Sequence, residues 1–261
     1  MTTRVFTLIF SLAFIISTLT GCATAIDVKV PTARLTAPEA QGGNLFEKRI
    51  KGGASLALEG NARVEVASRL LQSPPVTTAP HIDRTNDDLR GDLAIGILDH
   101  LDAQFRLADD SPWLLSLKYQ FLGAPRAEAQ EGNLSAALTL GGGHKNESGT
   151  SRAWFSGETT VDYDVDFNAL DVGLPVGYRF HRYFLAYAGP SLTYVWVDGN
   201  VTQGGRDYRT SGRIEQYGAH AGLRFDFMYW FAHTEWSYAH THYLSTTRPG
   251  NYWALMVGMQ L

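Results

Sequence analysis

The stretch QYGAHAGLRFDFMYWFAHTEWSYAH, residues 216–240, decides the fold class because its side chains alternate between apolar and polar. Tyr217 and Leu223 belong to the apolar set, whereas Arg224 belongs to the polar set between them. An alternation of period 2 is the pattern of a β-strand, whose successive side chains point to opposite faces. The break at Met228-Tyr229 predicts a turn, so the stretch predicts two antiparallel strands whose two faces meet different surroundings.

The same alternation recurs from about residue 53 to the C-terminus, and helical periodicity is hard to find there. It predicts an all-β fold of ten strands. The eighth and ninth strands form the stretch quoted above. The others cover 53–67, 91–98, 101–108, 112–122, 133–143, a segment that ends near residue 180, 183–198 and 252–261.

One of these strands changes phase. Along Val161–Phe167 the apolar residues occupy the alternate positions that are polar between Leu170 and Tyr178. Because a shift of one residue swaps the two faces of a strand, this reversal predicts a bulge or kink near Asn168.

The composition of the polar face argues against a soluble sandwich, whose exposed face is usually rich in Lys and Glu. Here the polar face carries mainly Gly, Ser, Thr, Asn and Gln, with charges of both signs. Charged residues make up 18% of the chain, below the roughly 25% of an average soluble domain. The net charge of −4 gives no reason to expect a nucleic acid partner. Long strands with one apolar and one polar face predict a transmembrane β-barrel with lipid outside and a polar lumen.

The joints between strands alternate in length, as the periplasmic turns and external loops of an outer-membrane barrel do. With an even number of strands, this alternation predicts that both termini lie in the periplasm. The short joints are at 99–100, 181–182 and 228–229, with 123–132 as an exception. The longer joints are at 68–90, 144–157, 199–211 and 243–251, with 109–111 as an exception.

The first residues have the pattern of a bacterial signal peptide, with a basic start and an apolar run, Val5–Leu19, that is short for a membrane span. Leu19-Thr20-Gly21-Cys22 resembles the lipobox of lipoproteins. We therefore predict a signal peptide over 1–21 and a lipid, such as palmitate, on Cys22, which is the only cysteine. Ordinary cleavage after Ala25, without a lipid, is the alternative.

Residues 22–49 contain several prolines and glycines and show no sustained period. We predict a flexible tether there, followed by the barrel over 50–261. A lipid in the inner leaflet of the outer membrane would suit a periplasmic N-terminus.

The pattern over roughly residues 53–261 resembles the small up-and-down outer-membrane β-barrel proteins of Gram-negative bacteria. The C-terminal strand, YWALMVGMQL over 252–261, resembles the assembly signal of that class, although it ends in Leu261 rather than in an aromatic residue. The resemblance implies a closed antiparallel transmembrane β-barrel, an up-and-down meander of about ten strands, with eight or twelve as alternatives. It also implies outer-membrane lipids as partners, and the barrel-assembly machinery as a partner through 252–261.

Aromatic residues cluster at the predicted strand ends, as expected of the two interfacial girdles of a membrane barrel. The predicted girdles contain Trp113, Phe180, Tyr183, Phe184, Tyr194, Trp196, Tyr229, Trp230 and Trp253.

The polar face supplies charges of both signs to a narrow lumen. Buried charges are tolerable when they are paired, so we predict a salt-bridge network that fills the lumen. A narrow pore for small solutes, lined by the same residues, is the alternative. The predicted network contains Glu59, Arg63, Glu65, Asp92, Asp102, Arg106, Lys118, Asp171, Arg179, His220, Arg224, Asp226, His233 and Glu235.

A rim hydrolase, either a protease or a lipid-modifying enzyme, is a second alternative. Asp162, Asp164, Asp166, His240 and His242 lie near the predicted outer rim, but their spacing matches no catalytic pair of barrel proteases.

The second set of hydrolytic side chains is His233, Glu235 and Ser237, which follow one another on the inward face of one strand, about 7 Å apart per step.

We therefore predict a structural or surface-interaction protein that is not an enzyme and has no cofactor or metal. The loops at 68–90 and 199–211 are the candidates for binding an external ligand.

Overall fold

The structure is a computed structural model that describes residues 26–47, 49–67, 81–153 and 159–260. The predicted signal peptide, Cys22 and Leu261 lie outside the described residues. No helix within the described ranges is long and apolar enough to cross a bilayer.

The described residues form twelve strands, and every strand pairing is antiparallel. In chain order they are β1 (Ile26–Pro31), β2 (Gly52–Ala67), β3 (Ile82–Leu98), β4 (Leu101–Ala108), β5 (Trp113–Leu122), β6 (Leu134–Ala153), β7 (Thr159–Gly173), β8 (Val176–His181), β9 (Phe184–Gln203), β10 (Arg206–Phe227), β11 (Trp230–Tyr243) and β12 (Thr246–Gln260).

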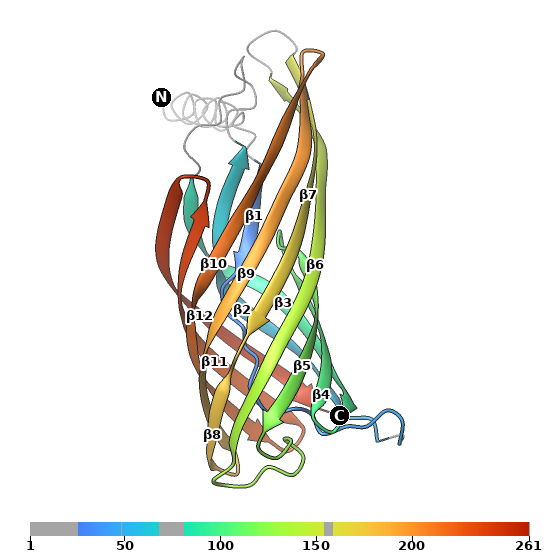
Figure 1. Cartoon of the computed structure of the whole chain (residues 1–261), viewed down its shortest axis with the longest axis vertical. Coiled ribbons are helices and arrows are strands. Elements are labelled where there is room, and N and C mark those ends of the chain that lie inside the picture. Colours follow the sequence, from blue (N-terminus) through green and yellow to red (C-terminus); the bar gives the residue numbers. More distant parts are fainter. Residues whose placement is uncertain (1–25, 48, 68–80, 154–158, 261) are drawn as a thin grey trace, which may run out of the picture.

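Strands β2 to β12 close into a barrel (Figure 1). Consecutive strands are neighbours, and β12 returns to pair with β2, from Ala254 opposite Glu59 to Gln260 opposite Gly53. Since β7 and β8 share one place between β6 and β9, the ring has ten places. The predicted ten-stranded closed antiparallel barrel is confirmed.

The lower part of the barrel, which contains the short turns, is apolar on its outer surface. On β10, Tyr217 and Leu223 are 48% and 51% exposed, whereas His220 and Arg224, at alternate positions of the same strand, are 2% and 5% exposed. A soluble protein would bury the first pair and expose the second. The outer surface is therefore the lipid-facing one, and its apolar run of about ten residues per strand fits the span of a transmembrane β-strand.

The upper part of the barrel has the opposite arrangement. On β7 the outward side chains change from Leu170 to Asn168 and Asp166, while Phe167 and Val165 are fully buried inside. The pairing with β6 runs without a shift from Thr159 to Gly173. The bulge that we predicted near Asn168 is therefore wrong. The strand keeps its phase, and its surroundings change instead: water lies outside and an apolar core lies inside above the bilayer.

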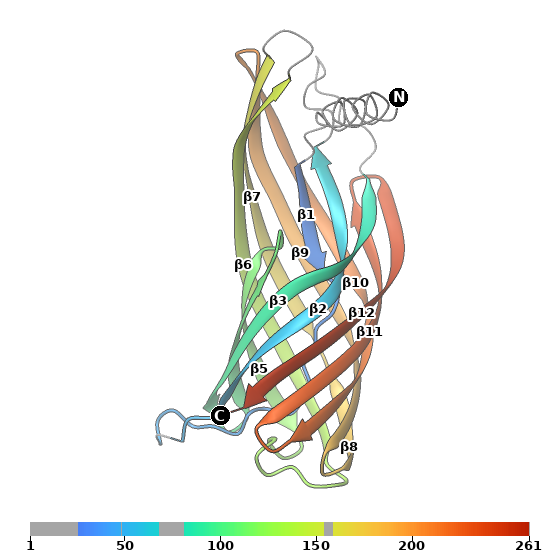
Figure 2. The ribbon, with the colours of Figure 1, turned by 180° about the vertical axis from the view of Figure 1, so that it is seen from behind.

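The longer joints are mostly strand as well. Residues 199–211, predicted to be a loop, complete a hairpin of β9 and β10 whose turn is Gly204-Gly205. Both glycines have positive φ angles, 55° and 75°, as a two-residue hairpin turn requires. The described end of the predicted 68–90 loop, from Ile82 on, belongs to β3. The strands β6, β7, β9 and β10 thus rise together beyond the others (Figures 1 and 2).

The N-terminal segment also differs from the prediction. Residues 26–43 are not a flexible tether: β1 pairs with β2 inside the upper barrel, and the chain then descends through the lumen. Ile26 lies opposite Ala67, toward the end of the barrel from which the long hairpins extend. Gln260 lies opposite Gly53, at the end of the barrel that contains the short turns. The described chain therefore begins and ends at opposite ends of the barrel, and the prediction that both termini share one side is wrong for these residues.

Candidate functional site

The lumen is filled by the chain itself. We call residues 32–41 the plug, because they pass through the lower barrel with most of their side chains buried. Thr32, Arg34 and Glu39 are only 2%, 3% and 2% exposed. An extended segment of this kind carries unpaired backbone groups that must find partners in the barrel wall, and the inward polar side chains supply them.

Glu235 on β11 holds the middle of the plug. Its carboxylate accepts hydrogen bonds from the backbone N–H groups of Arg34 (2.6 Å) and Leu35 (2.8 Å), and from the Tyr187 hydroxyl (2.8 Å). Leu35 has a φ of 49°, a left-handed conformation that costs free energy for a residue other than glycine. The two successive N–H groups converge on one carboxylate, which makes the site an anion-binding nest filled by Glu235.

Arg90 on β3 binds the carbonyl side of the same segment. Its guanidinium donates to the carbonyl oxygens of Ala33 and Arg34, both at 2.9 Å. It is also paired with Glu59 (2.9 Å) and Asp92 (2.7 Å), and it is only 1% exposed. Because two carboxylates neutralise it, this buried cation can remain charged while it binds the plug.

The charged side chains of the plug are paired with the wall. Arg34 contacts Asp171 on β7 at 2.5 Å and donates to the Thr193 hydroxyl at 2.6 Å. Glu39 accepts from Arg179 on β8 and from Asn133. The plug thus contributes one cation and one anion to the network, each opposite a wall residue of the other sign.

The last residues of the plug are bound through their backbone. Lys118 donates to the carbonyl oxygens of Ala37 and Glu39, and it is paired with Asp102 at 3.0 Å. The N–H of Ala40 donates to Gln120 at 2.6 Å, and the N–H of Gln41 donates to Asp102 at 3.0 Å. The wall therefore holds successive plug residues down to the short-turn end.

An apolar core closes the upper lumen above the plug. Val28 and Val30 of β1 are fully buried in one cluster with Phe167 and Val165 of β7 and with residues of β9 and β10. This core lies above the polar network, so the chain's own side chains pack inside both the upper and the lower barrel.

The structure places most residues of the predicted network inside the barrel. Twelve of its members face the interior: Glu59, Asp92, Asp102, Arg106, Lys118, Asp171, Arg179, His220, Arg224, Asp226, His233 and Glu235. Arg63 and Glu65 do not, because the register of β2 shifts between Glu59 and Asn61. Arg63 is instead half exposed and contacts Asp27 at the upper end.

Several residues of the site were missed. Arg34 and Glu39 lie in the segment predicted to be a tether, and Arg126 lies in a joint between strands. The only signal for the first two was the alternation IDVKVP over 26–31, which is too short to separate a strand from a loop. Arg90 precedes the predicted strand 91–98, although its spacing from Asp92 places both on the inward face.

The side chains considered for hydrolysis do not assemble into a relay. Ser237 donates to Glu235 at 3.2 Å, but Nδ1 of His233 lies 3.2 Å from the Leu35 carbonyl oxygen instead. All three side chains are buried in the lumen, where His233 and Glu235 contact the middle of the plug. At the rim, Asp164 and Asp166 bind Asn146, and His240 stacks on Tyr217.

The predicted girdle residues lie on the outer surface. Trp113, Trp196 and Trp253 are exposed at the upper edge of the apolar band, and Phe180, Phe184, Tyr229 and Trp230 are exposed near the short turns. Tyr183 and Tyr194 are half-buried.

The sequence matches no family model and no curated protein. Among solved structures, the attachment invasion locus protein Ail of Yersinia pestis is similar with a TM-score of 0.37 and 13% identity, over 81% of this chain and 98% of that one. Ail in complex with the heparin analogue sucrose octasulfate gives a TM-score of 0.36 and 12% identity, over 81% and 99%. A loop-deletion mutant of OmpT, an outer membrane protein of Vibrio cholerae, gives 0.21 and 9%, over 81% and 98%. These are distant likenesses, and the barrel is established by its own strand pairing.

Proposed function

We propose that the protein is an outer-membrane β-barrel with an occluded lumen and a structural or surface-interaction role. The observation that carries this proposal is a change of character along β7, β9 and β10: each has an apolar outer face in its lower part, and a polar outer face with apolar residues buried inside in its upper part. Below this change, the outer surface suits lipid. Above it, four long strands present a polar outer surface that suits water and external molecules.

The occluded lumen argues against the narrow pore. The plug forms hydrogen bonds with β3, β5, β8, β9 and β11, and it meets a fully apolar core above. A solute path would require these contacts to break. It also argues against a lumenal enzyme, because His233 and Glu235 bind the plug.

The orientation follows from the usual asymmetry of such barrels, whose periplasmic turns are short. We propose that the short turns and Gln260 face the periplasm and that Ile26 faces the exterior. Cys22 is four residues from Ile26, a reach of at most ~14 Å, which is less than the ~25 Å apolar band of a barrel. If Cys22 is lipidated, this short reach excludes the inner leaflet as the place of its acyl chains.

Outer-membrane lipids are the proposed partners of the apolar band. The strand 252–261 is the proposed contact with the barrel-assembly machinery, because β12 closes the ring. An external ligand would meet the hairpin of β9 and β10 rather than a loop at 199–211.

Epitope insertion tests this arrangement. An epitope between Gly204 and Gly205, or between Ala25 and Ile26, should bind antibody on intact cells. The matched control is an epitope between Met228 and Tyr229, which should bind only after the outer membrane is permeabilised. Antibody binding to the control insertion on intact cells, or none to the 204–205 insertion, would refute the orientation.

A further inference from the structure

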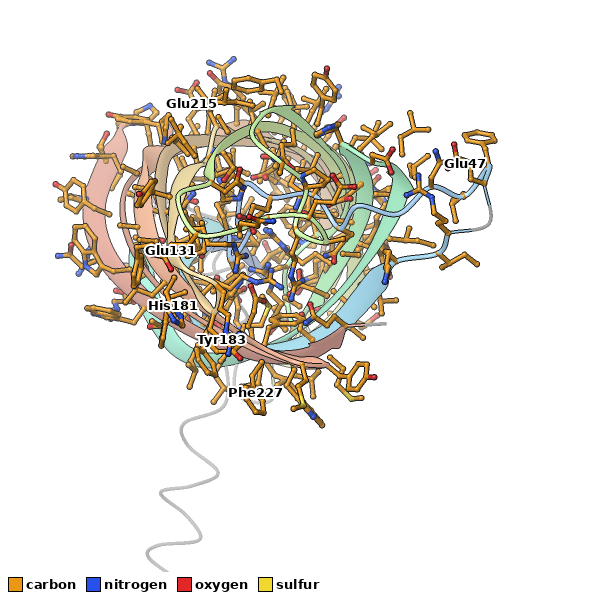
Figure 3. The ribbon with its side chains drawn as sticks, turned by 90° about the horizontal axis from the view of Figure 1, so that it is seen from below. Glu47, Glu131, His181, Tyr183, Glu215 and Phe227 are labelled. Carbon is orange, nitrogen blue, oxygen red and sulfur yellow. The ribbon has the colours of Figure 1, made fainter. Side chains whose placement is uncertain are left out.

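The short-turn end of the barrel contains a cavity of about 310 Å³ at the foot of the plug. Four cationic side chains line it: Lys51 before β2, Arg126 in the β5–β6 joint, Arg179 on β8 and Arg182 after β8. Among the described residues that line it, Asp226 is the one carboxylate. Figure 3 looks into this end, with His181 and Tyr183 labelled on either side of Arg182 in the sequence.

The carboxylates in this region are already engaged. Asp226 accepts from Arg126 (2.5 Å), Arg224 (2.7 Å) and Arg179 (3.0 Å). Glu39 is bound by Arg179 as well. Three guanidinium groups therefore share two carboxylates, which leaves an excess of positive charge before Lys51 and Arg182 are counted.

Arg126 is crowded by like charge. Its side chain is 7% exposed, and its guanidinium and that of Arg224 lie 5.2 and 4.5 Å from the same Phe231 ring. Burial and the neighbouring Arg224 lower the pKa of Arg126 below its usual value. An anion beside these groups would relieve this repulsion.

Two of the cations are available to a ligand. Lys51 and Arg182 are exposed, and neither has a carboxylate within 4.0 Å among the described residues. The rim also includes Met228 and Tyr229, which are 73% and 71% exposed. These two belong to the turn between β10 and β11, beside the lower aromatic girdle, so the cavity opens at the level of lipid headgroups.

We propose that this cavity binds a phosphate group through Lys51, Arg126 and Arg182. Guanidinium groups match the oxygens of phosphate in two-point contacts, and an ammonium adds a mobile point charge. The phosphate could belong to a soluble phosphate ester or to the headgroup of an anionic phospholipid. The second source depends on the proposed membrane insertion, whereas the first does not.

Two experimental arms separate these sources. In the first, glycerol 3-phosphate is titrated into the detergent-solubilised full chain by calorimetry. In the second, the protein is refolded in phosphatidylcholine vesicles that contain phosphatidylglycerol, and the phosphatidylglycerol retained after extraction is measured by mass spectrometry. Saturable binding in the first arm identifies a soluble ester, and selective retention in the second arm alone identifies a headgroup.

The double variant Lys51→Ala/Arg182→Ala should weaken binding about tenfold or more in the arm that shows it, because charged hydrogen bonds are lost. Both side chains are exposed, so the barrel should still fold, which heat-modifiable migration in gels checks. Arg209→Ala/Arg213→Ala removes two exposed cations from β10 at the other end and should leave binding unchanged. No binding by the wild-type protein in either arm, an unaffected double variant, or an equal loss in the control would overturn the proposal.

Discussion

The carboxylate of Glu235 lies 2.8 Å from the backbone nitrogen of Leu35, a residue 200 positions earlier in the chain. This contact ties the plug to the barrel wall at its middle, where Leu35 adopts a left-handed conformation. Since the same carboxylate also accepts from Arg34 and Tyr187, it is the wall residue on which the plug depends most.

Glu235→Gln should destabilise the folded protein by about 3 kcal/mol, because a neutral amide replaces a buried acceptor of charged-group hydrogen bonds. The amide N–H₂ group of the new glutamine would also face the donors of Arg34, Leu35 and Tyr187, which it cannot accept from. Urea unfolding in lipid vesicles, followed by tryptophan fluorescence, measures the change. The control is Glu215→Gln, on the outer face of β10 (Figure 3), which should change stability by less than about 0.5 kcal/mol. Equal stability of the two variants would contradict the role of Glu235.

Glu39→Lys should open the lumen. The new ammonium would face Arg179, which now holds Glu39 and is close to Arg126 and Arg224, so like charges would expel the lower plug. The wild-type protein should give no discrete current steps in planar bilayers, whereas this variant should give them. Glu128→Lys changes the same charge on the exposed β5–β6 joint and should stay silent. Current steps from the wild-type protein would favour the pore.

Leu223→Arg should cost about 2–4 kcal/mol of folding free energy in lipid, the range for an arginine on the lipid face near the bilayer midplane. Ser211→Arg places the same residue on the same face of β10, above the point where the outer surface turns polar, and should cost little. Urea unfolding in vesicles compares the two. If both substitutions cost the same, the assigned membrane boundary on β10 is wrong.

Phe167→Ala should destabilise the protein by about 3–5 kcal/mol, since it leaves a cavity in the apolar core of the upper lumen. The neighbouring Asn168 points outward and is exposed, so Asn168→Ala is the matched control and should be nearly neutral. Hydrogen exchange of the upper parts of β7 and β9 should rise in the first variant only. A neutral Phe167→Ala would mean that the upper lumen is not a packed core.

The sequence predicted most of the barrel because alternation is a local property. The first and last residues of strands such as 101–108 could be predicted from this alternation, since each apolar position there faces lipid and each polar position faces the lumen. The sequence also shows the phase change along Val161–Phe167. The predicted bulge is wrong because alternation reports only that the two faces of a strand differ, not which of them faces water.

The plug could not be predicted in the same way. Its residues have no period of their own, and their conformation is set by wall residues such as Glu235 and Arg90, far away in sequence. The shift in β2 between Glu59 and Asn61 was missed for a related reason: β2 pairs with β12 below it and with β1 above it. Neither partner is visible in the alternation of β2 itself.

The path of the N-terminal segment also constrains how the protein is assembled. Residues 26–43 thread a ring of strands that β12 closes by pairing with β2. We expect this segment to enter the barrel before β12 pairs with β2, because the charged side chains of Arg34 and Glu39 would otherwise have to cross a closed and narrow lumen to reach their partners in the wall. Pairing of β12 with β2 is then the last step of folding.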